Sequence, residues 1–269
     1  VLQRSAEVSE IYDAVDLRNE VINGDIEKVK TLLAIGTVID NKMYNKTNLM
    51  ISSEMGNIEI VRLLATNFCD PNILNHKGQN SFWLASQNKH FDVATMLLKE
   101  FNANPNIVSK LGKTLLHIAY EEHDDDLFNF LLDSGASPNV KNSENQTLQF
   151  IAFSNNDDEI AERIQNNYKG DINTTGKDGN SLGHLALINN DLKRLDYLLE
   201  RKLDINIRNE SGQSLFMWTI INTNKLSLCQ KMIDLGANID NQDNEGNSAF
   251  YCICKDQNLS SEKFDFLIK

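Results

Sequence analysis

The chain has 269 residues, of which 41% are hydrophobic and 24% charged, an ordinary balance for an ordered soluble protein. No apolar run approaches the roughly 18 to 20 residues that a membrane-spanning helix needs, so we expect no direct membrane insertion. The net charge of −12 argues against nucleic-acid binding, because phosphates are recognised by clustered Lys and Arg. A protein or peptide with a basic segment is the better expected partner.

The cysteines and the chain ends bear on the cellular setting. Cys69, Cys229, Cys252 and Cys254 are too few and too irregularly spaced for a disulfide framework. Reduced thiols, together with an N-terminal stretch that does not resemble a secretory signal, favour a cytoplasmic location. The sequence lacks an initiator Met and ends inside an amphipathic pattern, so we expect a piece of a longer protein.

A short motif recurs along the chain. Its clearest copy reads GKTLLHIA from Gly112 to Ala119, and it returns as GNSLGHLA from Gly179 to Ala186. The Thr, Ser or Asn in its third place, which we call the key position, falls at residues 47, 80, 114, 147, 181, 214 and 248. About twenty residues later a second signature follows, clearest from Leu131 to Asn139. Each repeat is therefore predicted to hold two short helices and a turn.

In chain order the predicted elements are an extension, a cap and seven repeats. The cap carries Glu20 where a small buried residue belongs and has no loop of the kind that joins the later repeats. The last repeat has no comparable cap and is predicted to be truncated or followed by further sequence. The expected bounds are 1–11 for the extension, 12–40 for the cap, and 41–73, 74–107, 108–140, 141–174, 175–207, 208–241 and 242–269 for repeats two to eight.

The local chemistry of each repeat supports this division. Thr or Ser at the key position is a good N-cap for the first helix. Gly36, Gly135 and Gly236 follow the second helix, where the chain must turn at positive φ. Each helix has one apolar stripe that it cannot bury alone, so the repeats must stack on one another.

The period and the paired signatures resemble the ankyrin repeat, which has about 33 residues and a Thr-Pro-Leu-His-x-Ala motif. The resemblance covers roughly residues 12–269 and implies an all-α solenoid of about eight helix-turn-helix units with β-hairpin-like fingers. The sequence departs from the pattern in three ways. No repeat keeps the Pro, Asn145 replaces the Gly before Thr147, and Gly183 stands where an apolar residue is expected. We therefore expect repeats five and six to be less regular than their neighbours.

No catalytic, cofactor or metal site is predicted, and we expect the chain not to be an enzyme. His117 and His184 occupy the His position of the repeat, where the ring is expected to hydrogen-bond the backbone of a finger. The spacing of Cys252 and Cys254 does not match a chelating pair. The sequence contains no dinucleotide-binding, phosphate-loop or nucleophile motif.

The resemblance implies that a partner binds the concave surface formed by the finger tips and the ends of the first helices. At these positions repeats two to four combine aromatic, Met, Leu and His side chains with charge, which are groups that dominate interface energies. Tyr44 and Met55 either anchor the partner or merely cover neighbouring repeats. The predicted partner-binding residues are Met43, Tyr44, Met55, His76, Lys77, Lys110, Leu111 and Glu121.

Asp124, Asp157 and Asp191 each lie ten residues after a key position, at the turn between the two helices. We call them the acidic ridge. They either cap the second helices or bind a Lys/Arg-rich segment of a partner, with an affinity that falls as salt is added.

Three functions are compatible with these patterns. The leading hypothesis is a scaffold that recognises a partner protein or peptide. The alternative is the targeting or regulatory arm of a larger enzyme or membrane protein. A purely mechanical spacer is disfavoured by Met43, Tyr44, Met55 and Leu111, because a spacer needs no anchor residues on its surface.

Overall fold

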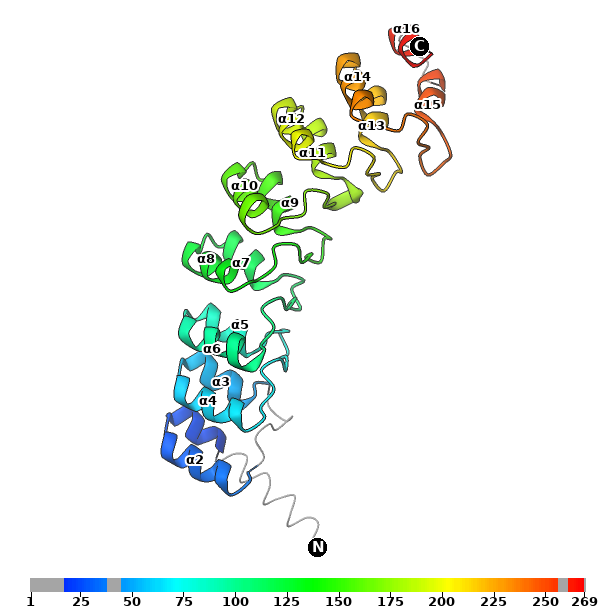
Figure 1. Cartoon of the computed structure of the whole chain (residues 1–269). Helices are drawn as coiled ribbons and strands as arrows, with labels where there is room; N and C mark the ends of the chain where they lie inside the picture. Colours follow the sequence, from blue (N-terminus) through cyan, green and yellow to red (C-terminus); the bar gives the residue numbers. More distant parts are fainter. Residues whose placement is uncertain (1–16, 38–44, 256–260, 269) are drawn as a thin grey trace, which may run out of the picture. The chain divides into compact units, whose positions relative to one another are not determined.

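The computed structural model describes residues 17–37, 45–255 and 261–268 (Figure 1). The chain divides into two compact units, residues 1–143 and residues 144–269, which we call unit 1 and unit 2 and describe separately. The predicted extension, the start of the cap, Met43 and Tyr44 lie outside the described residues.

Both units consist of short helices in pairs. In unit 1, residues 17–23 are helical and pair with α2 (Ile26–Ala34), and three further pairs follow. They are α3 (Asn48–Met55) with α4 (Ile58–Thr66), α5 (Ser81–Gln87) with α6 (Phe91–Phe101), and α7 (Leu115–Glu121) with α8 (Asp125–Asp133).

Unit 2 continues the same pattern. Its pairs are α9 (Leu148–Ser154) with α10 (Asp158–Asn167), α11 (Leu182–Ile188) with α12 (Leu192–Glu200), α13 (Leu215–Asn222) with α14 (Leu226–Asp234), and α15 (Ala249–Lys255) with α16 (Ser261–Leu267). A short 3₁₀ turn, η1 (Lys177–Gly179), precedes α11. The described residues contain no β-strand, so the predicted all-α class is confirmed.

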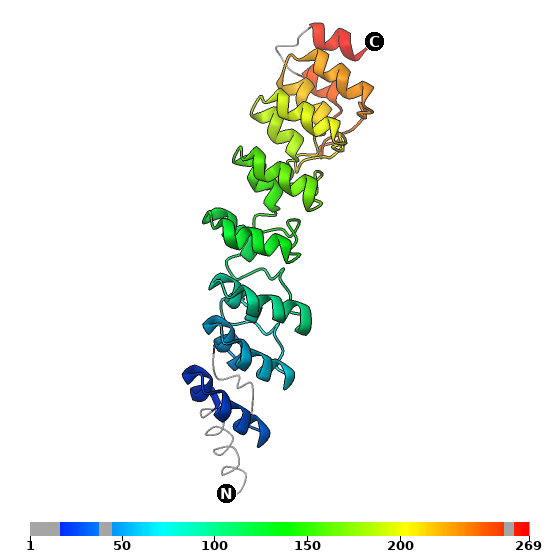
Figure 2. The same cartoon turned by 60° about the vertical axis from the view of Figure 1, so that its left-hand side comes forward.

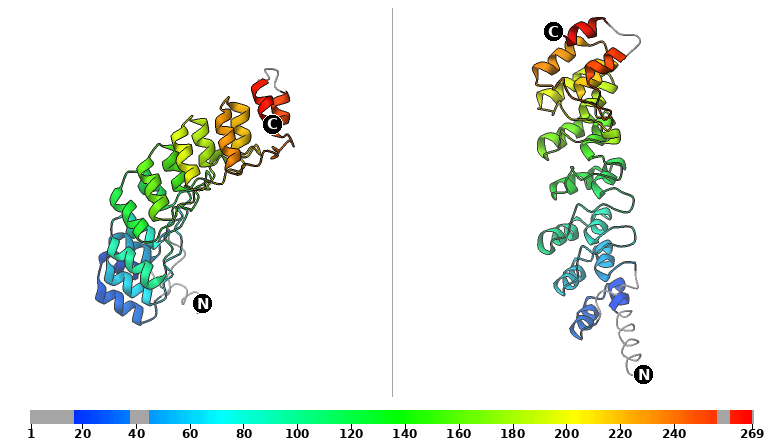
Figure 3. Two further views of the ribbon diagram at one scale, coloured as in Figure 1. Left: turned by 45° about the horizontal axis from the view of Figure 1, so that its top comes forward. Right: turned by 90° about the vertical axis from the view of Figure 1, so that its right-hand side faces the viewer.

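Within each unit the pairs follow one another in chain order, and the described long loops between pairs project to one side of the helices (Figures 2 and 3). In unit 1, Phe130 of α8 stacks on Phe91 of α6, with ring centroids 4.3 Å apart. In unit 2, a continuous core of buried side chains extends from Phe150 in α9 to Ile253 in α15. Each pair thus buries its apolar face against its neighbours.

The key positions start the first helices as predicted. Thr47 accepts a hydrogen bond from the N–H of Met50 at 3.2 Å, and Thr114 accepts one from the N–H of His117 at 3.3 Å. Asn80, where the motif has neither Thr nor Ser, does the same for Trp83 at 2.9 Å. In each case the side chain of the N-cap residue accepts from an N–H group that has no partner inside the helix.

The described loops between pairs are the predicted fingers. Only a few backbone hydrogen bonds close each of them. The N–H of Ser109 donates to the carbonyl of Lys113 at 2.9 Å, and the N–H of Asn75 donates to Gln79 in the same way. Isolated bridges join Thr175 to Ser181 and Gln242 to Ser248. The fingers are therefore hairpin-like turns without the ladders of true strands.

Both unusual residues of repeats five and six are accommodated by their surroundings. Asn145 has a φ of 61° and so takes the left-handed conformation of the glycine that it replaces. Gly183 lies in α11, where a Cβ atom would come within 2.7 Å of Leu203 Cδ2 and Leu215 Cδ1. Two buried leucines thus occupy the space that a side chain at Gly183 would need.

The two motif histidines are buried beside the N-caps. The Nε2 of His184 lies 3.1 Å from the carbonyl of Gln213 in the next finger, and the N–H of Ser181 donates to its Nδ1 at 3.2 Å. This confirms the predicted bond to a finger for His184. His117 makes the corresponding contact with Thr114, whose Oγ1 lies 2.6 Å from Nδ1.

A left-handed glycine at a close approach should be harder to replace than one in open space. Gly112 has a φ of 72°, and an added Cβ would overlap the Cβ of Ser143, whereas Gly135 has a φ of 84° and nothing near it. We expect Gly135→Ala to cost about 1 kcal/mol from strain alone, and Gly112→Ala to cost more. Urea unfolding followed by circular dichroism measures both, and equal midpoints would contradict this account.

His184 should make unit 2 sensitive to acid. Burial lowers the pKa of His184 from its ordinary value of 6.5 to about 4, because a charged ring would lose its hydration in the interior; the hydrogen bond to the Gln213 carbonyl acts in the opposite direction and offsets only part of this effect. The folded state therefore binds fewer protons than the unfolded state, and stability falls as the pH drops from 6.5 towards 4. We expect a loss of about 3 kcal/mol at the acid end of this range.

The control for this prediction is His184→Gln, which cannot titrate. The variant should be less stable than the wild type at neutral pH, but it should lose less stability on acidification. Urea midpoints at neutral pH and near pH 4 give this difference. An equal acid-induced loss in both proteins would show that His184 does not cause it.

Candidate functional site

A groove of about 400 Å³ opens in unit 1 between two finger tips and the first helices α5 and α7. Trp83 of α5 and Ile118 of α7 contribute apolar surface to it, and Leu111 adds an apolar group at the finger side. We call this site the finger groove. Its lining residues are His76, Lys77, Gln79, Trp83, Gln87, Ser109, Lys110, Leu111, Ile118 and Glu122.

The apolar floor of the finger groove contains a buried tryptophan. Trp83 is only 2% exposed, and its indole Nε1–H donates to Gln87 Oε1 at 3.2 Å. Leu111, by contrast, lies on the finger tip and is 77% exposed. A leucine so exposed beside an apolar floor leaves surface that a ligand can cover.

The finger tips are joined through their backbones. The N–H of Lys110 donates to the carbonyl of Lys77 at 2.9 Å, and the N–H of Ser143 donates to the carbonyl of Gly112 at 2.7 Å. These two bonds hold the finger tips at Lys77, Lys110 and Ser143 to one another, so the side chains at these tips are presented by a connected backbone. A second hollow of about 520 Å³ shares His76, Lys77, Gln79 and Gln87 with the finger groove and extends towards Lys46 and Glu54.

Four of the predicted partner-binding residues meet in the finger groove: His76, Lys77, Lys110 and Leu111. Met55 is 49% exposed at the end of α3 but does not line the groove. Glu121 forms an ion pair with Lys113 at 2.6 Å, and its neighbour Glu122 lines the groove instead. Met43 and Tyr44 lie outside the described residues. That these residues bind a partner stays a prediction.

Sequence reasoning missed Trp83 and Ile118 as parts of the site. Trp83 stands three residues after its key position, where two other repeats have His117 and His184. The larger indole at that position was the available signal. Ile118 gave none, because its place in the apolar stripe of α7 indicates only burial.

A family model described as ankyrin repeats (3 copies) matches residues 17–109, 56–142 and 115–209, which together make up more than half of the chain. The chain belongs to the ankyrin-repeat family. Ankyrin repeats are in general protein–protein interaction modules that expose an extended binding surface. This agrees with the position of the finger groove on finger tips and first helices.

Membrane-spanning helices and clusters of metal-ligating side chains are both absent from the described residues. None of the described helices is both long enough and apolar enough to cross a bilayer. Nor does any group of three or more His, Cys, Asp or Glu side chains there lie close enough together to hold a metal ion.

The acidic ridge caps the second helices of its ankyrin repeats. Asp124 accepts from the N–H of Leu127 at 3.1 Å, and Asp157 and Asp191 accept from the N–H groups three residues further on in the same way. Lys89 Nζ lies 3.0 Å from Asp124, and its hydrogen bond lowers the pKa of that carboxyl. The capping interpretation is confirmed, while binding of a basic segment stays a prediction.

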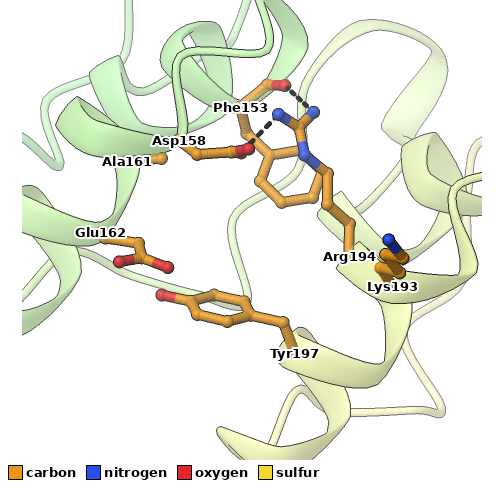
Figure 4. A pocket seen from close by; sticks show the side chains of 7 residues that line it. All are labelled: Phe153, Asp158, Ala161, Glu162, Lys193, Arg194 and Tyr197. Carbon is orange, nitrogen blue, oxygen red and sulfur yellow. Dashed lines mark hydrogen bonds and ion pairs between the residues drawn. The ribbon is translucent and has the colours of Figure 1, made fainter.

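Unit 2 contains a smaller pocket of about 200 Å³ between α10 and α12 (Figure 4). Arg194 lies over the ring of Phe153, with its guanidinium carbon 4.8 Å from the centroid, and donates to the Phe153 carbonyl at 3.0 Å. It also pairs with Asp158. In Figure 4 the hydroxyl of Tyr197 points towards Glu162, and burial raises the pKa of Tyr197.

Arg194 thus mainly holds two neighbouring ankyrin repeats together. Its side chain is only 11% exposed, and it holds α12 to the turn before α10. We expect Arg194→Ala to lower the free energy of unfolding by about 2 kcal/mol, because charged hydrogen bonds and packing are lost together. Lys89→Ala is the matched control, since Lys89 pairs with Asp124 at the corresponding turn but is 51% exposed. It should change stability little. Similar urea midpoints for the two variants would contradict the distinction.

Proposed function

We propose that the finger groove of unit 1 binds a segment of a partner protein and catalyses no reaction. The observation that carries this proposal is the combination of an exposed Leu111 with an apolar floor made by the buried Trp83 and the half-buried Ile118. Exposed apolar surface beside a well-packed floor is typical of an interface anchor.

The neighbouring hollow supports an extended segment as the ligand. The two hollows share four lining residues, so a bound chain can continue from Leu111 past His76 towards Lys46. Side-chain amides of Gln79 and Gln87 line both hollows and can hydrogen-bond the backbone of such a chain. Polar groups of this kind orient a ligand that apolar contact attracts.

We also propose that the chain acts as a recognition scaffold in the cytoplasm. Support comes from its four cysteines, which all lie among the described residues and form no disulfide bond. Free thiols are usual in a reducing compartment. The proposal of a scaffold without catalysis rests on the general role of ankyrin repeats and on the groove described above.

Removing the exposed leucine should weaken binding without unfolding the protein. A random-peptide library displayed on phage and selected on the intact chain supplies ligands, and fluorescence polarisation gives their Kd. We expect Leu111→Ala to raise the Kd roughly tenfold, since burying a leucine contributes about 1.5 to 3 kcal/mol.

The matched control is Ile35→Ala, because Ile35 is 69% exposed in the same unit but does not line the groove. It should leave the Kd unchanged. Circular dichroism establishes that both variants keep their helices. The proposed function fails if the selected peptides bind Leu111→Ala as tightly as the wild type.

A further inference from the structure

The charge of the finger groove is opposite to that of the whole chain. The chain carries 26 basic and 38 acidic side chains, yet two lysines stand on neighbouring finger tips at this groove. Lys77 and Lys110 are both exposed, and the backbone bond of 2.9 Å between them fixes their fingers side by side.

Among the described residues, these lysines differ from most other basic residues of unit 1 in forming no ion pair. Neither forms an ion pair with any residue that the structure describes. By contrast, six basic side chains of unit 1 lie within ion-pair distance of a carboxylate: Lys28, Lys30, Lys46, Arg62, Lys89 and Lys113. Two cations left together on a groove attract an anionic ligand.

The two ends of the groove carry opposite charges, because its lining contains a single carboxylate at one end. Glu122 follows α7, at the helix end of the site, whereas Lys77 and Lys110 stand at the finger end. The apolar groups Trp83, Ile118 and Leu111 complete the lining. A ligand carboxylate is therefore attracted to the finger end and repelled from the helix end.

We propose that the finger groove selects an extended peptide segment in which Asp or Glu stands close to a large apolar residue. The carboxylate lies between Lys77 and Lys110, and the apolar side chain covers Trp83 and Ile118. This inference rests on the proposed function, because it names the chemistry of the segment that the groove binds. The basic segment expected from the net charge has no counterpart here.

The finger tips of unit 2 do not share this chemistry. The residues that correspond to Lys77 and Leu111, one place before the turn residue at positive φ, include Glu144, Asp178 and Glu245. Lys177 stands beside Asp178, so the finger tips of unit 2 carry charges of both signs. The proposed site lies in unit 1, and substitutions confined to two of its fingers test it.

The test compares two double substitutions that change the net charge equally. Lys77→Glu/Lys110→Glu reverses the cations of the groove, and Lys99→Glu/Lys141→Glu reverses two exposed lysines of the same unit that do not line it. Displayed random peptides are selected on the intact wild-type chain, and the selected pool is sequenced. The Kd of the consensus peptide is then measured for each variant at low and at high salt.

We expect the pool to be enriched in Asp or Glu near Leu, Ile or Phe. Lys77→Glu/Lys110→Glu should raise the Kd at least about tenfold, and Lys99→Glu/Lys141→Glu should change it by less than about twofold. The affinity of the wild type should fall with added salt, and that of the groove variant should depend on salt much less.

Two outcomes overturn the inference and are distinguishable. If the selected peptides are basic or uncharged but still lose affinity for Leu111→Ala, the groove binds peptides and the acidic specificity is wrong. If the peptides are acidic but the two charge reversals weaken binding equally, only the overall charge matters and the site at Lys77 and Lys110 is wrong. Binding that is indifferent to Leu111→Ala rejects the proposed function itself.

Discussion

Each helix pair of this protein can bury its apolar face only against another pair. In unit 2 one core runs from Phe150 to Ile253 without a break, and the finger turns join each repeat to the next. The two unusual residues of repeats five and six are compatible with this requirement. Asn145 still turns the chain at positive φ, and Leu203 and Leu215 fill the space at Gly183.

Because the stacked backbone depends on a few positions in each repeat, the remaining positions are free to differ. The N-caps and the left-handed turn residues must satisfy the backbone, while the finger tips need only be joined to one another. Lys77, Lys110 and Leu111 occupy such tips. A repeated scaffold can thus present a site that occurs once, and the finger groove is such a site.

The net charge of the chain and the local charge at the finger groove differ in sign. The net charge of −12 predicts a basic partner, but carboxylates of the acidic ridge are used as helix caps and are paired with Lys89 and Arg194. Lys77 and Lys110, by contrast, stand on neighbouring finger tips, and neither forms an ion pair with a described residue. Exposed charges act over about 10 Å in salt, so the nearest groups decide what a groove attracts.

The sequence by itself determined the period, the all-α class, the ankyrin family and the residues that cap and turn each repeat, because these depend on local hydrogen bonding and backbone conformation. It also placed His76, Lys77, Lys110 and Leu111 at finger tips. Only the tertiary structure decided which of them share a groove, that Glu121 turns to Lys113 while Glu122 faces the site, and that Trp83 contributes to its floor. These facts depend on contacts between repeats about 33 residues apart, which no local pattern records.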